Sequence, residues 1–271
     1  MPKGGEAVPV GAFGGGELRV AESLRIVVWN VHKGLDARLE GDLAALARER
    51  TPHLFAFQES RPDLRLPEGY GGHHATSFVR RLKGKHEGVM TLSRVAPSSA
   101  HRVRSNEREL FVLTPKAALI SEYDLDDGRT LHVVNVHGLN FDPSGRQLAR
   151  QLEGLRERLA HIEGPLVVCG DFNTWNEARL AAARGVAHDL GLDEVAPDVP
   201  GGRKGHIRGG RLGRALGLDP RLHLDRLFVR GLTPLRSTWL EQYESSDHAA
   251  LFAELRFDRA RATGARDPLV R

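Results

Sequence analysis

The sequence of 271 residues contains a single cysteine, Cys169, and only 6% aromatic residues. A lone cysteine cannot form an internal disulfide, so stability must come from a hydrophobic core, and we expect a reducing, cytoplasmic location. No apolar run approaches the roughly 18 residues that a membrane-spanning helix needs. Residues 1–22 lack the apolar stretch of a secretion signal. These absences argue against a disulfide-stabilised secreted domain and against a membrane partner.

Neither sign of charge dominates the sequence, since it has 39 Lys and Arg residues and 35 Asp and Glu residues, for a net charge of +4. So small an excess is compatible with a polyanionic substrate and does not identify one. With 40% hydrophobic and 27% charged residues, the composition is that of an ordinary globular protein. Nothing in it indicates a coiled-coil seam, and we expect a monomer.

Short apolar runs bounded by polar or turn residues recur along the chain, and each predicts a strand. The expected strands are Leu24–Asn30, His53–Gln58, Gly88–Leu92, Leu110–Leu113, Lys116–Tyr123, Thr130–Val136, Pro165–Gly170, Leu222–Val229 and Ala249–Leu255. Helical patterns fall between some of them, at Asp42–Arg50, Ser144–Ile162 and Trp175–Arg184. This succession predicts two packed sheets covered by helices. The Gly- and Arg-rich stretch Pro197–Arg221 predicts a long loop.

Polar residues mark the ends of several predicted strands. Four strands run into a polar group at their C-terminal end, and these groups are Asn30, Gln58 with Glu59, His137 and Asp171. Two later strands carry polar groups at their start, Asp225 in one and Asp247 with His248 in the other. If these two strands run antiparallel to the first four, all six groups gather at one edge of the sandwich. Such a cluster of carboxylates, histidines and amides is typical of a metal-assisted hydrolase.

The residue types in this cluster favour particular chemistry. Glu59 and Asp247 offer hard oxygen donors and Asn30 offers an amide oxygen, a set that suits Mg²⁺ or Mn²⁺. Two histidines near carboxylates suit a general acid and a general base, because imidazole titrates close to physiological pH. The single cysteine excludes a zinc site built from several thiolates. No Gly-x-Ser-x-Gly motif indicates a serine nucleophile.

Short motifs follow one another along the chain. They are Val28-Trp29-Asn30-Val31, Gln58-Glu59, Gly88-Val89-Met90-Thr91-Leu92-Ser93-Arg94, Asn135-Val136-His137, Gly170-Asp171-Phe172-Asn173, Leu224-Asp225-Arg226-Leu227-Phe228 and Ser246-Asp247-His248. In this order they resemble the endonuclease/exonuclease/phosphatase superfamily, which includes pancreatic deoxyribonuclease, abasic-site endonucleases, neutral sphingomyelinases and inositol polyphosphate 5-phosphatases. The stretch from Asn135 to Phe141, with the Gln-containing helix after it, is most similar to the bacterial YafD-type branch.

The resemblance implies a fold and a domain organisation. The fold is a four-layer α/β sandwich of two packed mixed, mainly antiparallel sheets flanked by helices. A single domain is expected over residues 23–257, between a flexible N-terminal segment at 1–22 and a C-terminal tail at 258–271.

The resemblance also implies roles for the matching residues. Glu59 would be the main metal ligand, with Asn30 and Asp247 beside it. Asp171 would position or deprotonate the attacking water, and Asn173 would hold a phosphate oxygen. His248, oriented by Asp225, would contact the scissile phosphate, with His137 as the second histidine. The reaction would be in-line attack of a metal-activated water on phosphorus, and the resemblance leaves open which histidine is the acid.

The substrate is predicted less directly. His32 stands where abasic-site enzymes carry an acidic residue, and their active-site tyrosine has no counterpart, so dedicated abasic-site repair is not expected. Four basic residues in the Gly-rich loop are candidates for contacts with a nucleic-acid backbone, as against a merely solvated loop: Arg203, Lys204, Arg208 and Arg211. We expect a Mg²⁺- or Mn²⁺-dependent nuclease whose main substrate is DNA, with RNA as a secondary substrate. The alternatives are a phosphodiesterase or phosphatase acting on a lipid head group or small phosphoester, and a non-catalytic nucleic-acid-binding module of the same fold.

Overall fold

The computed structural model describes residues 4–80, 85–105, 107, 115–198 and 223–259. The predicted strand Leu110–Leu113, nearly all of the predicted loop Pro197–Arg221 and the tail beyond residue 259 lie outside these ranges. Within them, no helix has the length and apolar character needed to cross a membrane.

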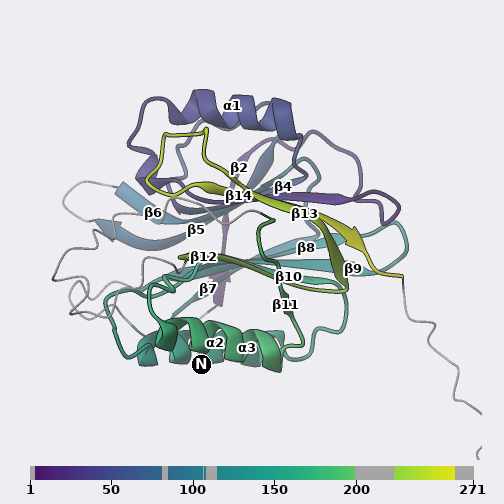
Figure 1. Cartoon of the computed structure of the whole chain (residues 1–271). Coiled ribbons are helices and arrows are strands. Elements are labelled where there is room, and N and C mark those ends of the chain that lie inside the picture. Colours follow the sequence, from purple (N-terminus) through teal and green to yellow (C-terminus); the bar gives the residue numbers. More distant parts are fainter. Residues whose placement is uncertain (1–3, 81–84, 106, 108–114, 199–222, 260–271) are drawn as a thin grey trace, which may run out of the picture.

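Two seven-stranded sheets pack face to face between two layers of helix (Figure 1). The first sheet has the order β1 (Gly4–Glu6), β7 (Ser99–Arg104), β8 (Ala117–Asp124), β9 (Thr130–His137), β10 (Leu166–Asp171), β12 (Asp225–Arg230) and β11 (Asp193–Glu194). The second has the order β13 (Leu232–Leu240), β14 (Ala250–Phe257), β3 (Leu24–Asn30), β4 (Leu54–Ser60), β6 (Lys85–Ser93), β5 (Gly71–Arg80) and β2 (Val8–Gly11).

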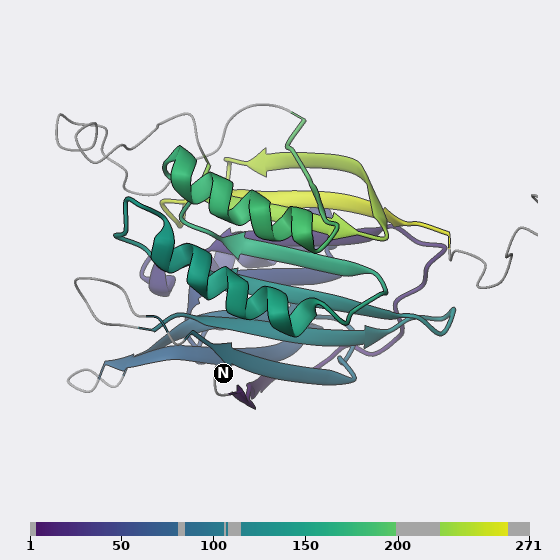
Figure 2. The ribbon, with the colours of Figure 1, turned by 90° about the horizontal axis from the view of Figure 1, so that it is seen from below.

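Helices cover the outer face of each sheet. Helix α1 (Leu39–Arg50) follows the short 3₁₀ turn His32–Gly34 and lies over the second sheet. Helices α2 (Arg146–Leu159) and α3 (Glu177–Asp189) lie side by side over the first sheet, as Figure 2 shows from below. The predicted four-layer α/β sandwich is therefore confirmed.

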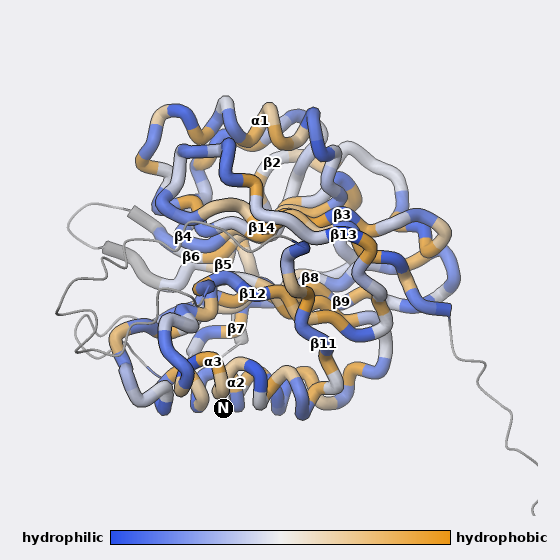
Figure 3. Tube along the Cα trace, in the orientation of Figure 1, coloured by the Kyte–Doolittle hydropathy of each residue, from blue (hydrophilic) through white to orange (hydrophobic). Residues whose placement is uncertain are grey.

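Four apolar clusters hold these layers together, and in Figure 3 the hydrophobic colour concentrates along the strands. Successive strand residues face opposite sides, so Ile26 and Val28 of β3 lie between the sheets while Val27 and Trp29 pack against α1. The leucines of α2 form one stripe, Leu148, Leu152, Leu155 and Leu159, and this stripe is buried throughout. Burying both faces of the central strands explains why they appear as continuous apolar runs in the sequence.

Strand directions bring the polar strand ends together. β3 runs parallel to β4, and β9 runs parallel to β10, so each pair ends at a common edge. β12 pairs with β10 and β14 pairs with β3, both antiparallel, so these two strands begin where their partners end. The condition under which the polar strand ends gather at one edge is therefore met.

The edge strands were not predicted, and the N-terminal segment differs from the expectation. Residues 4–11, expected to be flexible, supply β1 at one edge of the first sheet and β2 at one edge of the second. Strands β5, β7 and β13 also lack the apolar runs that identify central strands. Main-chain hydrogen bonds to a neighbouring strand stabilise such edges, and composition alone does not report them.

A buried amide pair joins the two sheets. Nε2 of Gln58 on β4 donates to Oδ1 of Asn135 on β9 at 2.7 Å. Nδ2 of Asn135 donates to the carbonyl oxygens of Phe57 at 3.1 Å and Met90 at 2.9 Å. Both side chains are fully buried. Since these bonds cross from one sheet to the other, they fix the position of β9 relative to β4 and β6.

This pair leads to a test by double-mutant cycle. We expect Asn135→Ala and Gln58→Ala each to lower the free energy of unfolding by about 2–3 kcal/mol, because each leaves buried polar groups without partners. The double variant should lose about 1 kcal/mol less than the sum of the single losses. Urea unfolding of the four proteins measures this coupling, and simple additivity would contradict the interaction.

The connection from β3 to β4 through α1 depends on His53. Its ring Nδ1 accepts a hydrogen bond from the backbone N–H of Arg25 at 3.0 Å. The backbone N–H of His53 donates to the Arg25 carbonyl at 2.8 Å. Burial, followed by the positive charge of Arg25, lowers the pKa of His53 to about 4. The neutral ring is the form that can accept this bond.

The lowered pKa predicts a pH dependence of stability. Because the unfolded state protonates His53 at a higher pH than the folded state, stability is fully present above pH 6.5 and is lost as the pH falls toward 4. We expect this residue to account for about 2 kcal/mol of that loss, allowing for solvent screening of a half-buried group. In His53→Asn an amide oxygen can still accept the Arg25 bond, so the variant should lose correspondingly less stability over this range. Urea unfolding of the wild type and His53→Asn across this pH range measures the difference. Equal pH dependence of the two proteins would refute the contribution of His53.

Candidate active site

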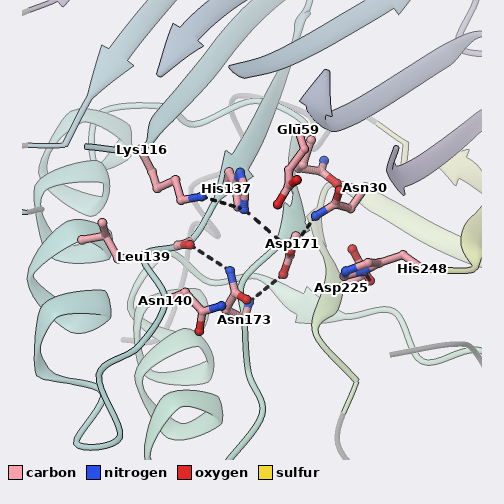
Figure 4. Close-up of polar contacts among 12 residues, drawn as sticks. Asn30, Glu59, Lys116, His137, Leu139, Asn140, Asp171, Asn173, Asp225 and His248 are labelled. Carbon is pink, nitrogen blue, oxygen red and sulfur yellow. Dashed lines mark hydrogen bonds and ion pairs between the residues drawn. The ribbon is translucent and has the colours of Figure 1, made fainter. Parts of the chain in front are cut away.

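The predicted polar residues converge at one edge of the sandwich. Figure 4 shows Asn30, Glu59, His137, Asp171, Asn173, Asp225 and His248 pointing toward a common region. Four come from the ends of β3, β4, β9 and β10, and Asp225 opens β12. The sequence thus predicted this convergence, while the role of each residue stays a prediction.

Asp171 lies at the centre of the group and is almost fully buried. Its Oδ2 accepts a hydrogen bond from Nδ2 of Asn30 at 2.9 Å, and its Oδ1 accepts one from the N–H of Asn173 at 2.8 Å. Nε2 of His137 lies 3.7 Å from Oδ2. Burial, reinforced by the negative charge of Asp225, raises the pKa of Asp171. A carboxylate with a raised pKa is a stronger base than an exposed one.

His248 forms a close pair with Asp225. Its Nδ1 lies 2.7 Å from Oδ2 of Asp225, and both side chains are buried. Burial disfavours the charged ring, but the Asp225 carboxylate outweighs it and raises the pKa of His248 to about 10. Trp29 Nε1 donates to the His248 carbonyl at 2.9 Å and Ser246 Oγ accepts from the His248 N–H at 3.2 Å. The ring is therefore cationic at neutral pH and its backbone is fixed.

His137 lies in the opposite electrostatic environment. Burial, followed by the positive charge of Lys116, lowers its pKa well below the ordinary value. Lys116 places Nζ 3.3 Å from Nε2 of His137. No motif or strand-end pattern in the sequence marks Lys116, although this residue opens a predicted strand. Only the antiparallel register of β8 with β9, in which Ala118 faces Val136, brings Lys116 to His137.

Glu59 is aimed into the site by an irregularity in β4. The pairing of β4 with β6 shifts register between Phe57 and Ser60, and Glu59 has a positive φ of 50°. This conformation is strained for a non-glycine residue. Anchors on either side hold it, since the Gln58 carbonyl accepts from the N–H of Val31 at 3.0 Å and the Ser60 carbonyl lies 3.2 Å from His74 Nε2. Such bulges re-aim side chains at functional sites.

Two further contacts complete the charged region. Nζ of Lys33 lies 3.8 Å from Oε2 of Glu59. Nδ1 of His32 lies 3.7 Å from Oδ1 of Asp247, while the His32 N–H donates to Oδ1 of Asn30 at 3.0 Å. His32 thus contacts both Asp247 and Asn30, which places Asp247 at the margin of the group.

The two buried carboxylates at the centre of the site favour a divalent cation close to them. Ligand atoms of Asp171, Asp225 and His248 all lie within 4.8 Å of one another and are buried. Oδ1 of Asp225 is buried without a hydrogen-bond partner among the described residues. Two adjacent buried carboxylates repel each other, and a cation offsets that repulsion. This grouping is not the set expected from the sequence, which was Glu59, Asn30 and Asp247; Figure 4 shows Glu59 and Asn30 beside it.

The predicted substrate contacts are not placed. Arg203, Lys204, Arg208 and Arg211 lie outside the described residues, so their proposed contact with nucleic acid stays a prediction.

Known proteins share both the sequence pattern and the fold. Residues 27–248 match the endonuclease/exonuclease/phosphatase family. A UPF0294 protein of Yersinia pseudotuberculosis is 33% identical over 242 residues, which cover 89% of this chain and 86% of that protein. A UPF0294 protein of Vibrio cholerae is 32% identical, over 86% of this chain and 78% of its own length.

Solved structures agree with this match. An endonuclease/exonuclease/phosphatase from Beutenbergia cavernae superposes with a TM-score of 0.65 at 19% identity, over 88% of this chain and 72% of that one. The catalytic domain of human Nocturnin, solved with a bound sulfate anion, gives 0.61 at 16% identity, over 89% of this chain and 96% of that one. At such identities the similarity supports the fold alone.

The chain belongs to the endonuclease/exonuclease/phosphatase family. Its relatives are the UPF0294, or YafD-type, proteins, as the resemblance predicted. Members of this superfamily include nucleases, phosphodiesterases and phosphatases, which are hydrolytic phosphoesterases and generally depend on a divalent metal. Membership therefore supports a phosphoester hydrolase without specifying its substrate.

The Gly170-Asp171-Phe172-Asn173 motif has a steric explanation. Gly170 lies beside Val136 in the parallel pairing of β9 and β10, with a φ of 137°. A Cβ atom at Gly170 would lie 1.9 Å from the Val136 carbonyl oxygen. Only glycine permits this approach, which places the next residue, Asp171, beside His137.

We therefore expect Gly170→Ala to lower the free energy of unfolding by about 3 kcal/mol or more, because backbone must move to admit the methyl group. Gly185→Ala is the matched control, since nothing lies within 4 Å of a Cβ built there in α3. That control should gain about 0.5–1 kcal/mol from helix propensity. Chemical denaturation measures both, and a loss below about 1 kcal/mol for Gly170→Ala would contradict the steric explanation.

Proposed function

We propose that this protein is a divalent-metal-dependent phosphodiesterase that hydrolyses nucleic acid, with DNA as its main substrate. One observation carries the proposal: buried Asp171 lies between His137, at 3.7 Å, and the Asp225–His248 pair. A base, a cationic donor and a neutral imidazole thus meet at one point, and such groups can supply the acid–base and electrostatic catalysis that hydrolyses a phosphodiester.

The metal would be held by Glu59, with Asn30 and Asp247 beside it. When bound, a divalent cation would offset negative charge on the phosphate and acidify the attacking water. Mg²⁺ or Mn²⁺ suits this oxygen-rich set better than zinc does.

Asp171 is the proposed base. Its raised pKa strengthens its affinity for the proton that the attacking water loses. The bonds from Asn30 and from the Asn173 N–H hold the carboxylate in one orientation, so that no reorganisation is needed as the proton moves. The Asn173 side chain, whose Nδ2 donates to the Gly138 carbonyl at 2.9 Å, lies next to this position and is proposed to contact a phosphate oxygen.

The two histidines have different proposed roles because their charges differ. His248, with a pKa of about 10, is cationic and can donate a hydrogen bond to a phosphoryl oxygen or a proton to the leaving oxygen. His137 is neutral, since burial and Lys116 lower its pKa. It is proposed to orient the phosphate through a hydrogen bond that carries no extra positive charge.

Nucleic acid is favoured as the substrate by the cations around this centre. Lys33 and Lys116 contact Glu59 and His137, at 3.8 Å and 3.3 Å. They would attract the phosphates that flank the scissile bond. The net charge of +4 acts in the same direction.

The test is nicking of supercoiled plasmid with Mg²⁺, Mn²⁺ or a chelator. We expect metal-dependent nicking that falls by roughly 10²-fold or more in Asp171→Asn, because the amide cannot accept the proton. Asp193→Asn on the exposed edge strand β11 is the matched control and should keep wild-type activity.

Bis(p-nitrophenyl) phosphate and p-nitrophenyl phosphate complete the substrate panel. Hydrolysis of the diester without nicking would move the substrate to a lipid head group or another small diester. Hydrolysis of the monoester alone would make the protein a phosphatase, and inactivity toward all three would overturn the proposal.

A further inference from the structure

Arg179 is a fully buried arginine in the first turn of α3, close to the site but not part of it. Burying a guanidinium is costly unless its donors are satisfied. Here it binds three backbone carbonyls: Nε donates to Asn173 at 2.5 Å, Nη1 donates to Asp142 at 2.9 Å, and Nη2 donates to Leu139.

These carbonyls belong to two loops that begin at proposed catalytic residues. Leu139 lies two residues after His137, and Asn173 lies two residues after Asp171. The loops leave the ends of the neighbouring parallel strands β9 and β10. One side chain therefore joins the two segments that extend the site beyond the sheet edge.

Both loops contain strained backbone next to these bonds. Asn173 has a φ of 53° and Phe141 has a φ of 63°, in the left-handed region that non-glycine residues rarely adopt. Such conformations persist only where surrounding contacts enforce them. The Arg179 bonds fall on Asn173 itself and on the residues that flank Asn140 and Phe141.

The guanidinium is itself held in place. It stacks over the Trp175 ring, with Cζ 5.1 Å from the ring centroid. Trp175 Nε1 donates to Oδ1 of Asn140 at 2.9 Å, which ties the stacking partner to the first loop. The N–H of Arg179 donates to the side chain of Asn176, the N-cap residue of α3, at 3.0 Å.

We propose that Arg179 is a positioning residue: it clamps the loop after His137 to the loop after Asp171 and so sets the orientation of Asn173 for turnover. The effect on turnover rests on the proposed function, whereas the clamp between the two loops does not. Arg179 acts through the Asn173 backbone, and the Asn173–Gly138 bond then links the same two loops on the side nearest Asp171.

The test compares Arg179→Lys with Arg230→Lys. Lysine keeps the charge but cannot reach three carbonyls with a rigid planar fork. Arg230 is the matched control, because it also binds carbonyls, those of Leu190 and Ile162, at the end of β12 opposite to Asp225.

In Arg179→Lys we expect amide hydrogen exchange in residues 138–145 to rise about tenfold, with the strands unchanged. The kcat of phosphodiester hydrolysis should fall roughly tenfold or more, with KM within about threefold, since positioning acts on the transition state. Arg230→Lys should change neither quantity.

Unchanged exchange in residues 138–145 would overturn the clamp whether or not the protein is active. Faster exchange with unchanged kcat would overturn the positioning role. An inactive wild type with faster exchange in Arg179→Lys would instead refute the proposed function and leave the clamp supported.

Discussion

Across the interface of the two sheets, the side-chain amides of Gln58 and Asn135 meet at 2.7 Å, and the site is arranged around this contact. Gln58 directly precedes Glu59, and Asn135 lies two residues before His137 on the same face of β9. Apolar packing alone leaves two sheets free to slide by fractions of a residue, whereas a buried hydrogen bond has one satisfied geometry. The amide pair therefore sets the distance between the proposed metal ligand and the proposed catalytic histidine.

The residues that project from this frame carry conformational strain. Glu59, Asn173 and Phe141 all have positive φ. Glu59 lies in the irregular end of β4, and the other two lie in the loops that follow β10 and β9. Hydrogen bonds hold the backbone at or next to each of them. They bind the carbonyls of Gln58 and Ser60 on either side of Glu59. The Arg179 side chain binds the carbonyls of Asn173 and of Asp142, which follows Phe141. Strain at a site is retained when the surrounding structure enforces it, and here the enforcing contacts are hydrogen bonds accepted by backbone carbonyls.

The sequence predicted the central strands well and the edges poorly. Leu24–Asn30 was predicted with the bounds that β3 has, because both faces of the strand are buried and it contains the continuous apolar run Ile26–Trp29. Val8–Gly11 and Gly71–Arg80 pair with each other through main-chain bonds, which composition does not encode. In the site, the strand-end rule found Asn30, Glu59, His137 and Asp171. It missed Lys116 and Arg179, whose partners are set by sheet register and by a helix start rather than by any local pattern.

The electrostatics of the edge favour an anionic ligand without selecting one kind of phosphoester. Two buried carboxylates, Asp171 and Asp225, repel each other, and the cationic His248 offsets only part of that repulsion. The site is thus suited to further positive charge and to an anionic ligand that arrives with it, whatever group that ligand carries. Discrimination between ligands must then come from the surfaces around the edge, which are loops rather than strands. A fully buried arginine at the base of two such loops is consistent with a specificity built on rigid loops, because a flexible loop would discriminate less between similar phosphoesters.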